Sequence, residues 1–291
     1  MAMLVTALDI IVGGVLLGGI YALIAVGLSL QYGVARVLNV AHGEYIMLGA
    51  FITWALYTGA GVNPLACLVV CGPLILILGY FLHKTVYRRL RILSPSVEAF
   101  EGSSMLASFG LLYVIQNIAI LIWGADIRGY SYLATPVNIG GAVFAANRLV
   151  MLAFALGIGI GFYLFLSRTR IGKAIRAAAQ DAAAAGMMGV NIDQVLALCF
   201  GLGALLAAVA GALLSMSYSL HATMGFEYTI IAIIIVALGG LGSIPGSFVG
   251  GFLLGIIGTV VTHFEPGLAM VAYYLLFMAL LLIKPTGIMG R

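Results

Sequence analysis

Charge is what this sequence has least of: charged residues make up 8% of its 291 residues, whereas hydrophobic residues make up 64%. Soluble globular domains carry roughly 25% charged residues, so the composition excludes that class. Apolar runs of about 20 residues, long enough to cross the hydrocarbon core, recur along the chain. Barrel strands are shorter and alternate in polarity, so the runs predict an all-α, polytopic integral membrane bundle.

Cysteine is also scarce, and Cys67, Cys71 and Cys199 lie inside apolar segments. Their spacing matches neither a disulfide framework nor a metal site. We find no glycine-rich loop ending in Gly-Lys-Ser/Thr, so ATP binding is not expected in this chain. No basic region followed by a cleavage site opens the sequence, so we expect no removable signal peptide.

The apolar runs divide the chain, taken as a single transmembrane domain over residues 1–291, into about eight to ten membrane segments. Two of them, 43–58 and 228–240, are too short to span comfortably and predict broken helices. The expected spans are 7–30, 43–58, 64–82, 103–123, 149–166, 194–216, 228–240, 246–262 and 267–283.

Lysine and arginine concentrate in the segments between some of these runs. Segments 83–93 and 168–194 carry most of them, joined by Arg36 and by Lys284 and Arg291 in the tail. With nine crossings all of these fall on one side, and basic residues favour the cytoplasmic side. We therefore expect a cytoplasmic C-terminus and an outer N-terminus. This placement of basic residues explains the net charge of +4, so we expect no nucleic-acid partner.

Glycine is abundant, at 39 residues, and small residues let membrane helices approach closely. Three groups have the spacing of such contacts, and we expect tight packing at each. They are Gly14 with Gly18, Gly157 with Gly161, and Gly242 with Gly246, Gly250 and Gly251.

The segment RIGKAIRAAAQDAAAAGMMGV, within 168–194, predicts a helix that begins basic and ends in small and apolar residues. It is too polar at its start for lipid and too apolar near its end for open water. Such an end suits insertion into a groove on a partner protein. An ordinary amphipathic surface helix is the alternative.

Four stretches in order carry a resemblance: LNVAHGEYIMLGA, RTRIGKAIRAAAQDAAAAGMMGVNIDQV, VALGGLGSIPGSFVGGFLLG and LLIKPTGIMGR. Together they resemble the permease family of branched-chain amino acid ABC importers, and in particular its LivH-type first permease. Family members also import urea, amides and small organic acids. The resemblance implies a multi-pass protein of the bacterial inner membrane.

The same resemblance implies partners: a second homologous permease, two cytoplasmic ATPase subunits that bind the ATP, and a periplasmic or extracellular solute-binding protein. Segment 168–194 then matches the coupling segment that docks on an ATPase. The residues carried over are Arg176, Ala177, Ala178, Asp181, Ala185, Gly186 and Gly189. Gln180 departs from the family pattern, in which an acid often stands there.

Polar residues cluster in one place among the apolar runs, at Asn39, His42 and Glu44. Asn39 can cap a helix that begins near Ala41, and Glu44 complements the positive end of that helix. His42 can hydrogen-bond to a neighbouring helix. The trio either caps and packs, or lines a path for a zwitterionic or amide solute. It lacks the spacing of a metal hydrolase.

Paired discontinuous helices indicate a substrate path in transporters, and the second short run ends in a glycine-rich break. That motif comprises Gly239, Gly240, Gly242, Ser243, Pro245 and Gly246.

The rival classes are a secondary transporter or urea-type channel, which needs no docking helix, and an intramembrane enzyme. Nearly charge-free spans disfavour ion coupling, and the four histidines are too scattered for a catalytic set. The sequence does not identify the solute.

Overall fold

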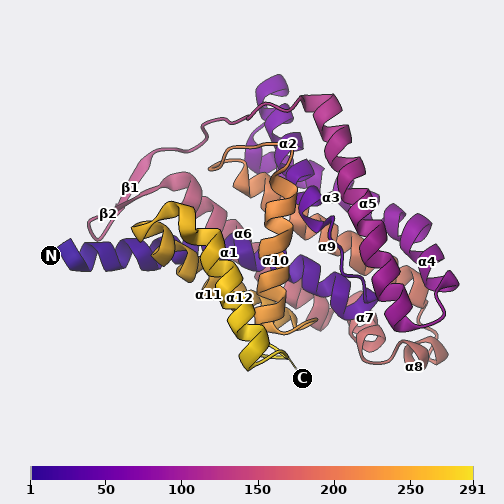
Figure 1. The fold of residues 1–291 in the computed structure, drawn as a ribbon. Coiled ribbons are helices and arrows are strands. Elements are labelled where there is room, and N and C mark those ends of the chain that lie inside the picture. The colour runs from indigo at the N-terminus through magenta and orange to yellow at the C-terminus, as the bar shows by residue number, and fades with distance from the viewer. Residues whose placement is uncertain (1, 291) are drawn as a thin grey trace.

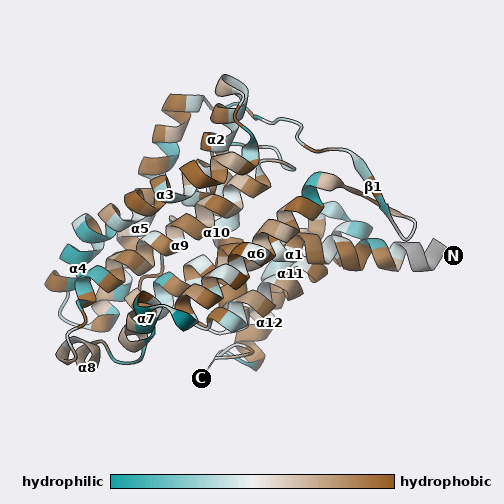
Figure 2. Ribbon diagram, turned by 180° about the vertical axis from the view of Figure 1, so that it is seen from behind, coloured by the Kyte–Doolittle hydropathy of each residue, from teal (hydrophilic) through white to brown (hydrophobic). Residues whose placement is uncertain are grey.

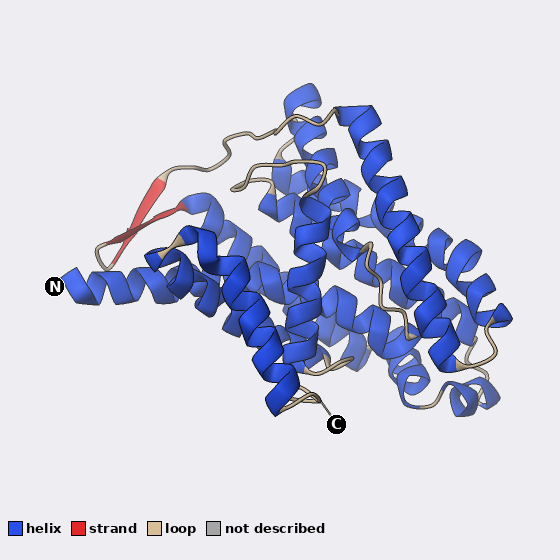
Figure 3. Ribbon diagram, viewed as in Figure 1, coloured by secondary structure: helices blue, strands red, loops and turns tan. Residues whose placement is uncertain are grey.

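A computed structural model describes residues 2–290, and it is a helical bundle with a single small hairpin among those residues (Figures 1 and 3). Seven stretches are long and apolar enough to cross a membrane. The α-helices are α1 (Ala2–Ala35), α2 (His42–Ala60), α3 (Pro64–Leu82), α4 (Arg88–Leu93), α5 (Val97–Trp123), α6 (Ala146–Arg168), α7 (Arg170–Gln180), α8 (Ala182–Met187), α9 (Ile192–Leu214), α10 (Met224–Gly239), α11 (Ile244–Phe264) and α12 (Ala269–Ile283).

All nine predicted apolar segments are helices, although α1 (Ala2–Ala35) is longer than the predicted 7–30 at both ends and α5 begins at Val97 rather than at 103. Helix α2 has 19 residues and α10 has 16, and neither is among the seven candidate spans. The all-α membrane fold is therefore confirmed.

The structure differs from the sequence-based expectations in three places. The basic segment 83–93, expected as a connection between two membrane segments, is itself helical, because the π-helix η1 (His83–Tyr87) and α4 continue α3 until Ser94 and Pro95. The segment expected as one helix is divided into α7 and α8 at Asp181. The hairpin β1 (Pro136–Ile139) with β2 (Ala142–Ala145) was not predicted, since four-residue strands leave little periodic signal.

Helix α9 is the centre of the bundle and is buried along most of its length. It packs on α1, α2 and α3, while α1 also packs along α11. Membrane helices approach this closely only where side chains are small. A Cβ at Gly49 would collide with the carbonyl of Ala208, and one at Gly211 with the carbonyl of Ile46.

The predicted glycine contacts are correct for two of the three groups. A Cβ at Gly18 would lie 2.8 Å from the Cα of Phe252, and one at Gly251 would collide with Ala22. Gly157 and Gly161 are different, because a Cβ at either meets nothing within 4 Å. These two glycines face outward, so tight packing is wrong for that pair within this chain.

Polar residues gather at one end of the molecule, where α4, α7 and α8 lie together (Figure 2). The C-terminal tail ends in the same region, whereas the hairpin lies toward the other end (Figure 1). The basic segments at 83–93 and 168–194 thus share one end, as sequence predicts. Arg291, also part of that prediction, lies outside the described residues.

Candidate functional site

A buried polar network surrounds the segment that connects α1 to α2. Asn39, His42 and Glu44 are all fully buried. The Oδ1 atom of Asn39 accepts a hydrogen bond of 3.1 Å from the backbone N–H of Ala41. Helix α2 begins one residue later, at His42, and its N-cap is Ala41, without a side-chain cap bond. The prediction that Asn39 caps this helix is therefore wrong, and Asn39 stabilises the turn before it.

Gln31, in α1, connects this turn to the centre of the bundle. Its Nε2 donates to the carbonyl of Phe200 in α9 at 3.0 Å, and its Oε1 accepts from Nδ2 of Asn39 at 3.2 Å. The ring nitrogens of His42 lie 3.3 Å from Gln31 Oε1 and 3.1 Å from the carbonyl oxygen of Ile24. Tyr87 adds a bond to Asn39 from η1, at 3.4 Å. Four helical elements thus meet through buried side chains.

Glu44 contrasts with its neighbours. Neither carboxylate oxygen has a hydrogen-bond partner among the described residues. The carboxylate lies directly against Gly225 in the first turn of α10, where a Cβ would collide with it. Burying a polar group without a hydrogen-bond partner costs free energy. Glu44 is thus a strong hydrogen-bonding group whose capacity is not used inside the bundle.

The two short helices meet at this point. The backbone N–H of Gly43 donates to Oγ1 of Thr229 at 2.8 Å, and that hydroxyl lies 3.0 Å from the carbonyl oxygen of Val40. A Cβ at Gly43 would collide with the carbonyl of Gly225. The pair α2 and α10, predicted as related broken elements, is therefore in direct contact beside Glu44.

The glycine-rich motif joins α10 to α11 through a sharp turn. Gly240 and Gly242 have φ of 102° and 79°, values that favour glycine. Ser243 caps α11 by accepting from the N–H of Gly246 at 3.2 Å, and Pro245 lies in the first turn. Gly239 and Gly246 are in backbone contact, since a Cβ on either would strike the other.

The tail folds back on this turn. The N–H groups of Ile288 and Met289 donate to the carbonyl oxygens of Leu238 and Gly239, at 2.8 and 3.0 Å. The motif therefore forms a structural corner at the basic end rather than facing Glu44 and the turn before α2.

Segment 168–194 forms two helices because Asp181 has an extended backbone and caps α8. Its Oδ1 accepts from the N–H groups of Ala183 and Ala184, at 2.9 and 3.0 Å. Of the residues carried over by resemblance, Ala178 and Ala185 are buried within the chain. Arg176, Ala177, Gly186 and Gly189 are at least partly exposed.

The most exposed apolar side chains of this segment are Met187 and Met188, at 83% and 85%. They follow Gly186 at the end of α8, and the chain then turns through Gly189, whose φ is 86°. Isolated exposed apolar residues are ordinary, but adjacent methionines at the end of a short helix form an adaptable contact surface.

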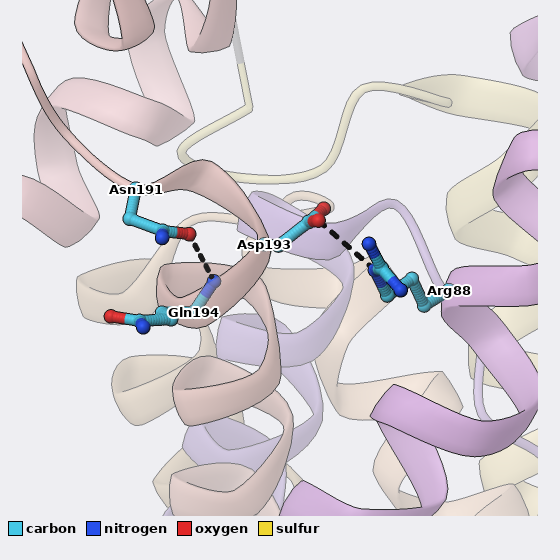
Figure 4. Close-up of polar contacts among 4 residues, drawn as sticks. All are labelled: Arg88, Asn191, Asp193 and Gln194. Atoms are coloured by element: carbon cyan, nitrogen blue, oxygen red, sulfur yellow. Dashed lines mark hydrogen bonds and ion pairs between the residues drawn. The ribbon is translucent and has the colours of Figure 1, made fainter.

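Two side-chain contacts hold the end of this segment, where the chain enters α9 (Figure 4). Asn191 caps α9 by accepting from the N–H of Gln194 at 3.0 Å, and Asp193 pairs with Arg88 of α4 at 3.0 Å. Both charged side chains are about half exposed, so the ion pair contributes little energy, but it links α9 to α4 beside α8.

Sequence reasoning did not find Gln31, Tyr87 or Thr229 as members of the network around α2. Gln31 was visible as an amide close to Asn39 in sequence. Tyr87 and Thr229 were not identifiable, since only the packing of distant helices brings them there.

Comparison with known proteins gives consistent results. A family model described as the branched-chain amino acid transport system permease component matches residues 10–284. The chain is 32% identical to the high-affinity branched-chain amino acid transport system permease protein BraD of Pseudomonas aeruginosa, covering 97% of this chain and 95% of that protein. It is 30% identical to LivH of Escherichia coli K12, covering 96% and 94%.

A solved structure, PsaBC from Streptococcus pneumoniae in complex with Fab, resembles the fold with a TM-score of 0.52. The match covers 94% of this chain and 91% of that one at 12% identity, so it shows likeness of fold alone.

Proposed function

Because the chain belongs to the family of branched-chain amino acid transport permeases, and is an ABC importer permease on that ground, we propose the following arrangement. The chain pairs with a second homologous permease in the bacterial inner membrane, with its C-terminus in the cytoplasm. Two cytoplasmic ATPase subunits power transport, and an external solute-binding protein delivers the solute. Family membership favours this over the secondary transporter and urea-type channel.

Met187 and Met188 carry the ATPase part of the proposal. They are strongly exposed at the basic end of the bundle, on a short helix capped by Asp181. A groove in an ATPase subunit would bury these side chains. Movement of the groove would then be passed to α9 through Asn191, the residue that caps that helix. Within segment 168–194, the buried Ala178 and Ala185 then shape the segment, while Gly186 and the methionines make the contact.

The solute we propose is a branched-chain or similar aliphatic amino acid. The named relatives are branched-chain amino acid permeases, which supports this class. Glu44 supports it further, because its unpartnered carboxylate suits the ammonium group of an amino acid. Asn39 and His42 already have partners within the chain, so their role in this proposal is to hold α2. Solute would reach Glu44 only when α2 and α10 separate.

The docking proposal is tested with the Met187→Arg/Met188→Arg double variant, co-expressed with the ATPase subunits. Two charged side chains cannot be buried in an apolar groove, so we expect co-purified ATPase and ATP-driven uptake in proteoliposomes to fall at least about tenfold. Ile127→Arg is the matched control, since Ile127 is 73% exposed but belongs to the loop after α5. Normal ATPase recovery by the double variant would refute this docking surface.

A further inference from the structure

A cavity of about 640 Å³ opens at the basic end, among the end of α1, helix α7, the turn between α10 and α11, and the tail. Arg36 and Arg176 both line it, and no carboxylate is among its lining residues in the described chain. A cavity with two cations and no acid favours an anionic occupant.

The two arginines have donors to spare. Arg36 lies 5.8 Å over the ring of Tyr32, and its guanidinium has no hydrogen-bond acceptor among residues 2–290. Its φ of 55° is uncommon for a residue with a side chain, so the surrounding structure holds it in that position. Arg176 donates one bond, of 3.2 Å, to the carbonyl of Ser167. The other donors of that guanidinium are available.

Ser29 supplies an independent observation. It is fully buried, lines the same cavity, and its hydroxyl has no hydrogen-bond partner among the described residues. Buried hydroxyls nearly always have a partner. An oxygen-rich group in the cavity would provide one.

A second, almost wholly apolar groove of about 270 Å³ adjoins this cavity, and Ile244 and Pro245 line both. It runs between α1, α6 and α11. The other lining residues are Val26, Gly159, Ile160, Phe162, Tyr163, Phe248 and Val249. Most of these belong to helices that are candidate membrane spans.

We propose that the cavity and the groove together bind one anionic phospholipid. The phosphate-bearing head group lies between Arg36 and Arg176 and accepts from the hydroxyl of Ser29, while an acyl chain lies in the groove. Basic pockets between membrane helices on the cytoplasmic side suit such head groups. The proposal rests on the cytoplasmic placement of the basic end, and needs neither the ATPase contact nor the role of Glu44. A soluble anion would use the cavity but gain nothing from the groove.

The test measures binding of dioleoylphosphatidylglycerol to the purified full-length chain by native mass spectrometry, with dioleoylphosphatidylcholine and soluble glycerol phosphate as comparison ligands. We expect selective retention of the anionic lipid. Arg36→Gln/Arg176→Gln should weaken it about thirty-fold, the effect of two arginines at an anionic lipid surface. Ile160→Trp should also weaken binding by filling the groove.

Two controls make the result decisive. Arg89→Gln removes an exposed charge from the same end outside the cavity, and Val69→Trp adds bulk at an exposed position of α3 outside the groove. Both should bind lipid as the unmodified chain does, and melting temperatures identify any variant that has unfolded. Equal losses in test and control variants, no loss in folded test variants, or equally tight binding of glycerol phosphate would overturn the proposal.

Discussion

The carboxylate of Glu44 lies against Gly225 and has no hydrogen-bond partner among the described residues. Two residues earlier, the ring nitrogens of His42 contact two oxygens. The three polar residues that look alike in sequence therefore differ in their surroundings. Asn39 and His42 join α2 to its neighbours, and removal of either leaves buried groups unsatisfied. Glu44 makes no such bond, so in our proposal its role is contact with the solute and not helix packing.

Asn39→Leu and His42→Ala should each lower the free energy of unfolding by about 1–3 kcal/mol, because partners such as Gln31 remain buried and unpaired. Glu44→Gln should leave the melting temperature nearly unchanged while reducing amino acid uptake per folded complex about ten- to a hundredfold. Thermal unfolding and uptake are measured on the same purified importer complexes. Unchanged uptake by Glu44→Gln would remove Glu44 from the solute path.

Among the elements, the long helices could be predicted because the bilayer requires continuous apolar runs. The division at Asp181 was less visible, since alanine-rich residues on both sides favour one helix and only the capping geometry separates them. Part of the network around α2 could not be predicted from the sequence, because Thr229 reaches Gly43 only through the packing of α10 on α2. Arg176 was assigned to coupling from resemblance, and only the structure places it at the cavity.

Helix packing yields a contrast between two glycines. Gly251→Val in α11 should destabilise the chain by about 1–3 kcal/mol or more, because a Cβ there collides with Ala22 of α1. Gly157→Val in α6 should change stability little, since a Cβ there has open space around it. Folded yield and melting temperature in detergent distinguish the two. Similar losses in both variants would contradict the packing of α1 against α11.

At the scale of the whole molecule, basic segments distant in sequence lie at one end, which gives the bundle two chemically distinct ends (Figure 2). From that asymmetry we propose that the basic end lies in the cytoplasm. The three native cysteines are buried, so they should not interfere with labelling of introduced ones.

A single cysteine at Ser96, in the exposed turn before α5 at the basic end, should react with a membrane-impermeant maleimide only after the cells are opened. A cysteine at Ser131, in the exposed loop after α5, should react in cells with a permeabilised outer membrane and an intact inner membrane. The unmodified chain serves as the blank. Labelling of both positions from the same side would contradict the proposed topology.

The pairing of α1 with α11 also sets an order of events during synthesis. Gly18 and Gly255 are in backbone contact, although nearly the whole chain separates them. At about 5–20 residues per second, the ribosome takes roughly 10 to 50 s to make the intervening sequence. Throughout that interval the glycine face of α1 is in the bilayer without its native neighbour. That face of the newly inserted helix must therefore remain unpaired, or be shielded by insertion machinery or a temporary neighbour, until α11 arrives.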